Sequence, residues 1–358
     1  MKIAVVAVTR QGFELAEKTA ALLKKGGRET TLYVPGKFSL LQTGGRHPYR
    51  KPLRELFGDL FGEYQGIVCI MALGIVVRLI APHLRSKTTD PAVVVMDELG
   101  HNVISVLSGH WGGANDLALQ IAGELGANPV ITTATDVNGL PAVEMLARDR
   151  GWVIEPFELV KKANSAIVNG EKITIYSDIP IEIDQTENMQ VKPLSGYSPA
   201  RREEGRVVLV TNQAEDRFPA GTLFIRPRNL YVGVGCRRGV SAIEVREAVL
   251  AALEEAGLAV NSVCALASVD IKSDEVGLLA AAEELQLPVK FFDRPALMGV
   301  LQERGDELGF SEFVDKKIGV GGVCEPAAIL SAGEAPEILK TKTKYGRVTI
   351  AIAAGGWQ

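Results

Sequence analysis

The 358-residue sequence has only four cysteines and four histidines, and they are not arranged as metal ligands. No CxxC pair occurs, and no histidine stands at zinc-ligand spacing from a cysteine. We therefore expect no protein metal site. Buried free thiols are the expectation for the four cysteines, Cys69, Cys236, Cys264 and Cys324.

The sequence also lacks a long apolar run. The longest nearly uncharged stretch covers residues 66–77 and is followed directly by Arg78, so it is too short to span a bilayer. The opening residues, MKIAVVAVTRQG, contain no small-residue cleavage site and pass directly into a helical pattern. We expect a first strand here, no membrane anchor, and a cytoplasmic protein.

Charge is scarce overall but unevenly distributed, with a net value of −4. Residues 1–90 hold 14 Lys and Arg against 7 Asp and Glu, a local charge of +7 that leaves −11 for the remainder. Such a basic segment attracts polyanions, and nucleic acid is the first partner that it suggests. The pI of about 5.8 and the scarcity of interleaved aromatics suit a small polycarboxylate or phosphate equally well, and we expect no nucleic-acid partner.

Short β-branched runs alternate with helical patterns along almost the whole chain. This alternation predicts an α/β protein of several domains, with mostly parallel sheets flanked by helices. We expect an N-terminal α/β domain at residues 1–130 that carries the catalytic site, a smaller α+β middle domain or connector at 131–226, and a C-terminal α/β domain at 227–358. A helix is expected from Ala114 to Leu125, and a hairpin around Asn169-Gly170, a dipeptide typical of tight turns.

The run LSGHWGGAND, residues 107–116, is the strongest candidate for a site. It leads from an expected strand into an expected helix, a place where α/β proteins bind ligands. His110 is the candidate catalytic imidazole, and the alternative is a histidine that only orders the loop. Gly109, Gly112 and Gly113 leave the backbone free to approach a ligand, and amides at the helix start favour an anion. Asn115, at that start, joins the substrate-binding candidates.

Three further polar residues are catalytic candidates. Ser108 departs from the GxSxG pattern of a hydrolase nucleophile, so an orienting hydroxyl is favoured over a covalent role. Asp97 and Glu98 follow an expected strand and could orient the histidine or act as general base. The alternative for this pair is a simple turn.

Two groups of residues are candidate substrate ligands outside that loop. Lys87 and Arg78 could pair with substrate carboxylates, with a solvated surface as the alternative. In the C-terminal region, GVGCRRG and GVGGVCEP each lead from a strand into a helix and could hold acidic groups through backbone amides. Neither matches a P-loop or a dinucleotide fingerprint. The candidates in these two turns are Gly233, Gly235, Arg237, Gly321 and Gly322.

Several long runs are more specific than any single glycine pattern: MALGIVVRLIAP, SKTTDPAVVVMDELGHNVISVLSGHWGGANDLA, GVGCRRGVSAIEVREAVLAAL, LASVDIKSDEVGLLAAAEELQLPVKFF and GVGGVCEPAAIL. Together they resemble the cobalt-precorrin-5A hydrolase family of anaerobic cobalamin (vitamin B12) biosynthesis. The resemblance covers nearly the full chain and is weakest between about 150 and 226. It implies a C-terminal domain that binds tetrapyrrole.

The resemblance implies hydrolysis of a δ-lactone on a cobalt-corrinoid ring, with release of acetaldehyde. Cobalt arrives inside the substrate, so no protein cofactor is expected. No catalytic residues come with the resemblance. From chemistry and position we hypothesise that His110, oriented by Asp97 or Glu98, activates water, and that glycine amides of its loop or Lys87 stabilise the oxyanion.

Other readings stay open at this point. A tetrapyrrole carrier would bind the intermediate without chemistry, a methyltransferase would need S-adenosylmethionine, and a nucleic-acid protein would show steeply salt-dependent binding. Neighbouring enzymes of the cobalamin pathway are candidate partners, and the sequence is compatible with a homo-oligomer.

Overall fold

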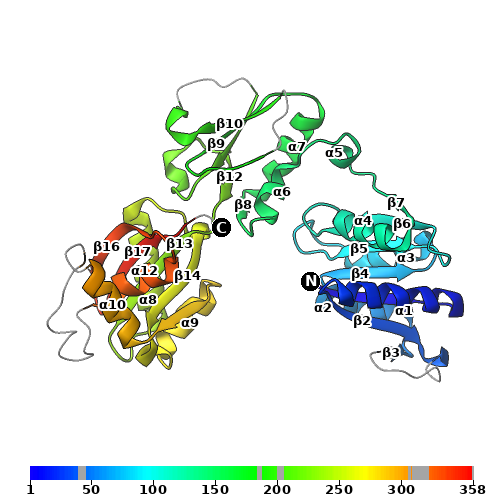
Figure 1. Ribbon diagram of the computed structural model, residues 1–358, viewed down its shortest axis with the longest axis horizontal. Helices are drawn as coiled ribbons and strands as arrows, with labels where there is room; N and C mark the ends of the chain where they lie inside the picture. The colour runs from blue at the N-terminus through cyan, green and yellow to red at the C-terminus, as the bar shows by residue number, and fades with distance from the viewer. Residues whose placement is uncertain (39–45, 184–187, 200–204, 305–307, 309–321, 357–358) are drawn as a thin grey trace. The chain divides into compact units, whose positions relative to one another are not determined.

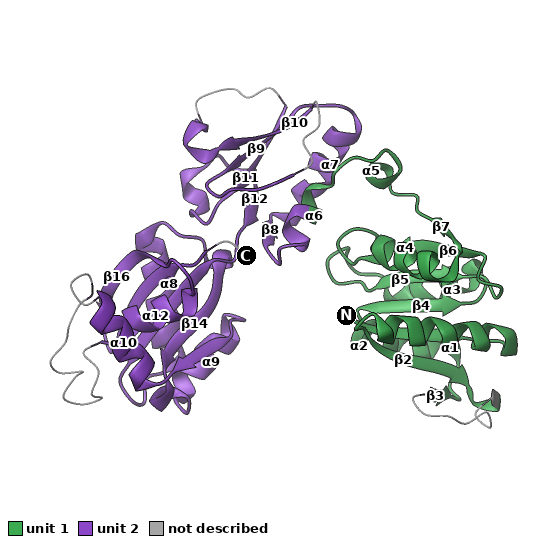
Figure 2. Ribbon diagram, viewed as in Figure 1, with its two compact units in different colours: residues 1–145 green, residues 146–358 purple. Residues whose placement is uncertain are grey.

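A computed structural model describes residues 1–38, 46–183, 188–199, 205–304, 308 and 322–356 of the chain (Figure 1). These residues form three β-sheets. The chain divides into two compact units, a first unit of residues 1–145 and a second unit of residues 146–358 (Figure 2). The predicted α/β fold with mostly parallel sheets is confirmed, whereas the boundaries at 130 and 226 stay predictions.

The first unit contains one seven-stranded sheet. Its strands are β1 (Lys2–Ala7), β2 (Glu29–Pro35), β3 (Arg46–Tyr49), β4 (Gly66–Ile70), β5 (Ala92–Met96), β6 (Asn102–Leu107) and β7 (Asn128–Val130). They lie in the order β3-β2-β1-β4-β5-β6-β7, and all neighbours are parallel except β5 and β6. The helices are α1 (Arg10–Lys25), α2 (Leu53–Glu63), α3 (Leu73–Ile80), α4 (Ala114–Leu125), α5 (Ala134–Val137) and α6 (Val143–Arg148), and α6 spans the division between the units.

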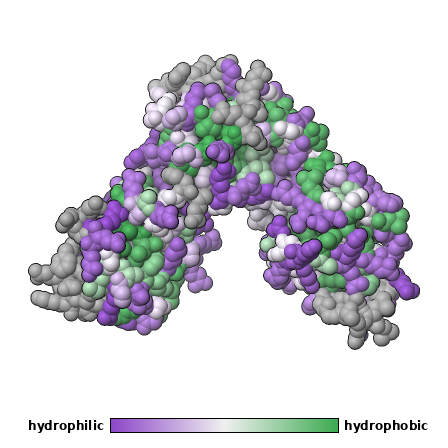
Figure 3. Space-filling model, viewed as in Figure 1, coloured by the Kyte–Doolittle hydropathy of each residue, from purple (hydrophilic) through white to green (hydrophobic). Residues whose placement is uncertain are grey.

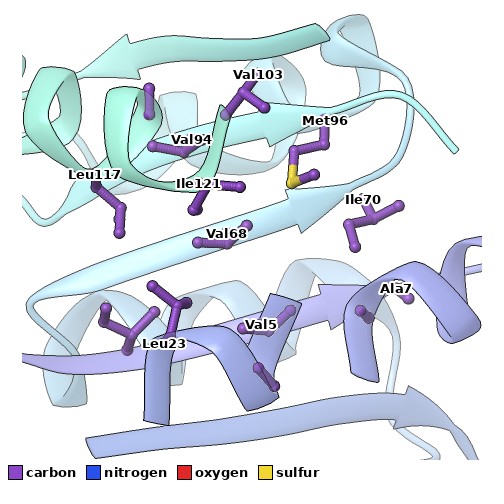
Figure 4. Close-up of a cluster of buried hydrophobic side chains, with 14 of the residues drawn as sticks. Val5, Ala7, Leu23, Val68, Ile70, Val94, Met96, Val103, Leu117 and Ile121 are labelled. Carbon is purple, nitrogen blue, oxygen red and sulfur yellow. The ribbon is translucent and has the colours of Figure 1, made fainter. Parts of the chain in front are cut away.

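The central strands are apolar on both faces because helices cover both sides of the sheet. Every residue of β4 and β5 is buried, which is typical of parallel strands between two helical layers. On one face, Leu23 of α1 and Leu117 and Ile121 of α4 pack over Val68 and its neighbours (Figure 4). Burying each such side chain contributes about 1.5–3 kcal/mol, so this layer holds α4 firmly against the sheet.

Helix α4 begins and ends at glycines in the left-handed region. Gly113 precedes it with φ of 83°, and Gly126 follows it with φ of 67°. Because L side chains are strained at such angles, glycine fits both ends. The helix predicted from Ala114 to Leu125 is confirmed.

The second unit begins with a five-stranded sheet. Its strands are β8 (Val153–Glu155), β9 (Ile173–Ser177), β10 (Met189–Pro193), β11 (Arg206–Val210) and β12 (Leu223–Arg226). They lie in the order β10-β9-β11-β12-β8, with only β12 and β8 antiparallel.

The hairpin predicted at Asn169-Gly170 is wrong. Residues Val160–Val168 form helix α7, and Asn169 ends it. Val160, Ala163, Ala166 and Ile167 are buried on one face, so helical spacing outweighs the turn dipeptide. Gly170, with φ of 70°, serves the helix end instead of a β-turn between strands.

A second five-stranded sheet follows. Its strands, β13 (Leu230–Cys236), β14 (Val263–Val269), β15 (Val289–Phe292), β16 (Glu337–Tyr345) and β17 (Val348–Ala354), lie in the order β15-β14-β13-β17-β16. Pairs that include β17 are antiparallel. The helices are α8 (Ala242–Ala256), α9 (Val276–Glu284), α10 (Arg294–Arg304) and α12 (Cys324–Ala332).

Glu155, at the end of β8, contacts both sheets of the second unit. Arg226 of the neighbouring β12, which is 1% exposed, donates from Nε to Glu155 at 2.5 Å within the first of these sheets. Asn261, just before β14 of the other sheet, also donates to Glu155. Burial lowers the pKa of Arg226, against the opposite effect of Glu155. Losing Glu155 would leave the buried Arg226 without its carboxylate partner, so this pair is sensitive to substitution.

No helix in the described part of the chain has the length and apolar composition needed to cross a membrane. Polar and apolar residues are intermixed over the face drawn in Figure 3. The surface in view therefore shows no uniformly apolar band on either unit.

Candidate active site around His110

The site forms where two parallel strands end beside each other. β6 and β7 are parallel neighbours connected through α4, with Ile104 opposite Val130. Residues that follow the two strands therefore meet at one edge of the sheet. This edge brings the loop of residues 108–113 next to residues 131–136.

His110 is held by a carboxylate at each ring nitrogen. Its Nδ1 lies 2.9 Å from Oε1 of Glu144, and its Nε2 lies 2.5 Å from Oδ2 of Asp136 and 3.0 Å from Oγ1 of Thr135. The imidazole is 13% exposed, Glu144 8% and Asp136 34%, so Asp136 is the carboxylate that solvent or a ligand can reach.

This environment favours the protonated ring. Hydrogen bonding to Glu144 raises the pKa of His110 above its usual 6.5, and Asp136 adds to the rise, while burial opposes it. An imidazolium can donate to both carboxylates at once, whereas a neutral ring can donate to only one. The two carboxylates thus favour the protonated form of His110.

Asn115 completes the arrangement from the first turn of α4. Its Nδ2 donates to Thr133 Oγ1 and to Asp136 Oδ2, both at 3.1 Å, and its Oδ1 accepts from Ser105 at 2.7 Å. Because Asn115 is 3% exposed, these bonds fix the position of Asp136. We call the group the His110 cluster: His110, Asn115, Thr133, Thr135, Asp136 and Glu144.

The glycines of the loop let its backbone fold tightly on itself. A Cβ at Gly109 would lie 2.7 Å from Asn115 Oδ1, and one at Gly112 would clash with Ser108. The amides of Gly113, Ala114 and Asn115 donate to carbonyls within the loop at 3.0–3.1 Å. The prediction that amides at the helix start bind an anion is wrong for these three, because the amides of Gly113, Ala114 and Asn115 already donate to carbonyls.

Ser108 has an orienting position. Its φ is 57°, an uncommon value for serine, and its Oγ donates to the carbonyl oxygen of Asp90 at 3.0 Å. The hydroxyl therefore joins the residues before β5 to the loop after β6. This geometry agrees with the weaker, non-covalent role that the sequence favours for Ser108.

Asp97 and Glu98 lie at the opposite edge of the sheet. β5 and β6 are antiparallel, so the carboxyl end of β5 lies beside the amino end of β6. The carboxylate of Asp97 accepts from the backbone amides of Leu99, His101 and Asn102. Burial acts to raise the pKa of Asp97, but these hydrogen bonds outweigh it and lower the pKa. The expected pairing of Asp97 or Glu98 with His110 is therefore wrong, and Asp97 organises a turn.

The two basic candidates are both exposed. Lys87 lies in the segment before β5, at the same sheet edge as His110. Arg78 lies on α3 and donates to the carbonyl oxygen of Gly74 at 2.9 Å. Contacts of Lys87 and Arg78 with substrate stay predictions.

The C-terminal glycines occupy packing positions. Gly233 and Gly235 lie within β13. A Cβ at Gly233 would overlap the carbonyl oxygen of Cys324 at the start of α12, and one at Gly235 would lie 2.5 Å from Thr349 Oγ1. The absence of a Cβ at both glycines thus lets α12 and β17 pack close to β13.

The rest of the C-terminal candidates are dispersed. Arg237 is exposed, Gly322 is buried just before α12, and Gly321 lies outside the described residues. Cys69 and Cys324 are buried as expected, whereas Cys236 and Cys264 are only partly buried. Burial raises the pKa of Cys236, which favours the packed thiol over a nucleophile.

Four members of the His110 cluster were missed by sequence reasoning. Thr133, Thr135 and Asp136 follow β7 in the run TTATD, and a polar run after a strand beside that of His110 is a usable signal. Glu144 is 34 residues from His110, and nothing local in the sequence marks it. Over the described ranges, no group of three or more His, Cys, Asp or Glu is placed to hold a metal ion.

Comparison with known families covers most of the chain. Residues 55–136 match the family model described as Cobalamin synthesis G N-terminal, residues 141–227 match the Cobalamin biosynthesis central region, and residues 230–353 match the Cobalamin synthesis G C-terminus. The three matches follow the order of the three sheets.

Individual relatives extend over the full length. A cobalt-precorrin-5A hydrolase from Priestia megaterium is 35% identical, covering 98% of this chain and 94% of the relative. One from Salmonella typhimurium is 33% identical, covering 93% and 92%. The crystal structure of CobE, a protein from the cobalamin biosynthetic pathway, is 33% identical over 37% of this chain and 94% of CobE, with a TM-score of 0.34. The identity to the two hydrolases over nearly the full length shows that the chain belongs to the cobalt-precorrin-5A hydrolase family.

Proposed function

We propose that this chain is a cobalt-precorrin-5A hydrolase that opens the δ-lactone of its substrate with water and releases acetaldehyde, leaving cobalt-precorrin-5B. Near full-length identity of 35% and 33% to two relatives of that name supports the reaction. The observation that supports its site best is the imidazole of His110 between the carboxylates of Glu144 and Asp136.

Lactone hydrolysis needs one group that takes a proton from water and one that gives a proton to the leaving alkoxide. The raised pKa of His110 suits the imidazolium to the second task. Asp136, the more exposed carboxylate at 2.5 Å from Nε2, takes the water proton. We therefore assign the base to Asp136 and the acid to His110, in place of the base role that the sequence suggested for the histidine.

The proton balance of this step closes within the pair. Water adds to the lactone carbonyl as Asp136 accepts its proton, and the carbon–oxygen bond breaks as His110 protonates the alkoxide. Asp136 then returns its proton to Nε2 across 2.5 Å. In the second step the new hydroxyl, on the carbon C20 that leaves as acetaldehyde, loses its proton to Asp136. The bond between C20 and the macrocycle then breaks. Acetaldehyde leaves, and the electron pair of that bond stays on the macrocycle.

Glu144 has a positioning role because it contacts Nδ1, the ring nitrogen opposite the one that reacts. It is 8% exposed, and its bond to Nδ1 directs Nε2 toward Asp136. Buried carboxylates in this position hold a histidine in one orientation and stabilise its cation.

Cobalt is proposed to arrive within the substrate, and no step above uses a cofactor. The cytoplasm as its location, neighbouring pathway enzymes as partners and a homo-oligomeric state all stay predictions. Acetate and propionate arms make such a substrate a polycarboxylate, which fits the local charge of +7 over residues 1–90.

The test is anaerobic incubation of the purified protein with cobalt-precorrin-5A, with acetaldehyde trapped as a hydrazone. The native chain should release acetaldehyde, and His110→Ala should release it about 10²–10⁴-fold more slowly. His101→Ala is the matched control, since His101 is exposed in the turn at the other sheet edge. Binding without release by the native chain would support the carrier instead.

The pH profile separates the two roles of His110. If the imidazolium is the acid, kcat falls as pH rises through the raised pKa of His110. A kcat that instead increases through that pKa would make His110 the base and contradict our assignment.

A further inference from the structure

A second polar site lies in the second unit, away from the His110 cluster. It is a cavity of about 350 Å³. Arg150 and Trp152 line it from the segment leading into β8. Arg228 and Asn229, just before β13, and Tyr231, within β13, line it from the other sheet. The cavity thus lies where the two sheets of this unit meet, and no Asp or Glu is among the residues that line it.

Asn229 lines this cavity and carries a buried hydrogen-bond donor. The residue is 3% exposed, and its Nδ2 has no hydrogen-bond partner among the described residues. Its Oδ1 accepts from Asn212 at 3.3 Å, and its backbone carbonyl accepts from Gly355 at 2.9 Å. These bonds hold the side chain in place, so the free donor points to an acceptor brought by a ligand.

Two arginines line the cavity with Asn229, and neither is paired with a carboxylate of the described residues. Arg150 donates to the carbonyl oxygens of Leu146 and Glu182, both at 3.3 Å, and its guanidinium lies 5.4 Å from the ring centroid of Trp152. Neutral carbonyls and an aromatic face orient a guanidinium but leave its charge uncompensated. A guanidinium has five N–H donors, so further donors are available to a ligand.

Arg228 is held in the same manner from the other side. Its Nε and Nη2 donate to the carbonyl oxygen of Val263 at 3.2 and 2.9 Å. Nearby, the Lys290 ammonium lies 4.9 Å from the ring centroid of Tyr231 and adds a third positive charge. Both arginines are only partly exposed, so their attraction for an anion is screened less than on an open surface.

We propose that this cavity binds a carboxylate group, held by Arg150 and Arg228 and by the Nδ2 donor of Asn229. Planar carboxylates match the arginine fork, and an amide N–H completes the contact to an oxygen. The aromatic side chains of Trp152 and Tyr231 suit the methylene groups that carry such a carboxylate. The source of the carboxylate rests on the proposed function: with that substrate, it is an acetate or propionate arm of the tetrapyrrole.

The same chemistry could come from a free dicarboxylate, so the test uses two ligands. Glutarate represents the free anion and is titrated by calorimetry. Uroporphyrin I, a tetrapyrrole with eight carboxylates, is titrated by fluorescence, with its octamethyl ester as the uncharged comparison. Both titrations use the full chain at low ionic strength and require no turnover.

Asn229→Asp is the main variant because it keeps the shape and the Oδ1 acceptor but replaces the donor with a negative charge. It should weaken binding of the carboxylate ligand about tenfold or more. Asn169→Asp adds the same charge at the exposed end of α7 and should change affinity less than about twofold.

Arg150→Gln tests the site from its other wall, with Arg246→Gln as the control on the exposed face of α8. Arg150→Gln should weaken binding about tenfold, and Arg246→Gln should not. Thermal unfolding of each variant checks that the chain is folded.

The outcomes are distinct. Binding of uroporphyrin but not glutarate, lost in Asn229→Asp, assigns the site to a tetrapyrrole arm; glutarate binding with the same sensitivity and no uroporphyrin binding assigns it to a free anion. Equal affinities in all variants, or no binding of either ligand, would overturn the proposal. These titrations require no turnover, so failure here leaves the acetaldehyde assay of the proposed function untouched.

Discussion

Two glycine-rich stretches of this chain, residues 107–116 and 232–239, are similar in sequence and different in what they do. Each contains closely spaced glycines and leads into a helix. In the first, the glycines lie in a loop that folds around Asn115 and presents His110 to Glu144 and Asp136. In the second, Gly233 and Gly235 lie within β13 and admit α12 and β17.

The comparison shows that glycine spacing alone does not distinguish a ligand loop from a packing contact. Both uses require the same property, a backbone without a Cβ. What separates them is the polar side chains that the topology gathers beside the glycines. Parallel strands β6 and β7 bring polar side chains to the first stretch. In the second, the start of α12 at Cys324 packs against Gly233.

The largest expected effect comes from Asp136→Asn, beside the first stretch. Removing the carboxylate that takes the water proton should lower kcat for acetaldehyde release about 10²–10⁴-fold. Asp274→Asn, beside the second stretch, removes an exposed partner of Arg238 and should leave kcat within about twofold. Equal rates in both variants would remove the functional side of the comparison.

Gly233→Ala tests the packing side of the comparison. Because the added Cβ would overlap the Cys324 carbonyl oxygen, the β13–α12 contact must shift, and the free energy of unfolding should fall by about 3 kcal/mol. Urea denaturation followed by circular dichroism measures it. An unchanged midpoint would show that α12 approaches β13 less closely than described here.

Stability should depend on pH through His110. The folded pKa of His110 is raised above 6.5, chiefly by Glu144, so its stabilisation is fully present below about 6.5 and is lost as pH rises through the folded value. Glu144→Gln should flatten this decline. Unfolding at a series of pH values, with the His110 ring titrated by NMR, checks both; a pKa at or below 6.5 in the native chain would contradict the proposed ion pairs.

The smallest effect is expected from Gly123→Ala, because Gly123 lies neither in the ligand loop nor at a close packing contact. Gly123 is exposed within α4, its φ is not positive, and a Cβ there would meet no atom within 4 Å. Alanine should stabilise the helix by about 0.5–1 kcal/mol. A urea midpoint that decreases would mean that this glycine, too, has a packing role.

Several elements were readable from local pattern. Helix α4 begins and ends at the predicted residues because apolar spacing and flanking glycines agree. A capping box of Ser241 and Glu244 forms at the start of α8, as the local S-x-x-E pattern favours. At Asn169-Gly170 the turn dipeptide favours a hairpin, whereas the apolar spacing before it favours a helix. The helix forms because it buries one apolar face.

The candidate site was readable only in part. His110 and Asn115 stood out because both lie between a strand and a helix in a glycine-rich run. The direction of β6 was not readable, since an apolar run is the same in a parallel and an antiparallel pair. That direction places Asp97 at the far edge and leaves the near edge to Asp136.

The sequence by itself determined the α/β class, the family and the loop that carries His110, because each depends on residues close together in the chain. Only the tertiary structure decided the partners of His110 and the cavity that holds Asn229. Glu144 reaches the histidine from 34 positions away, and Arg150 and Arg228 meet across two sheets. Strand order and direction set such distances, and these follow from the packing of the whole domain.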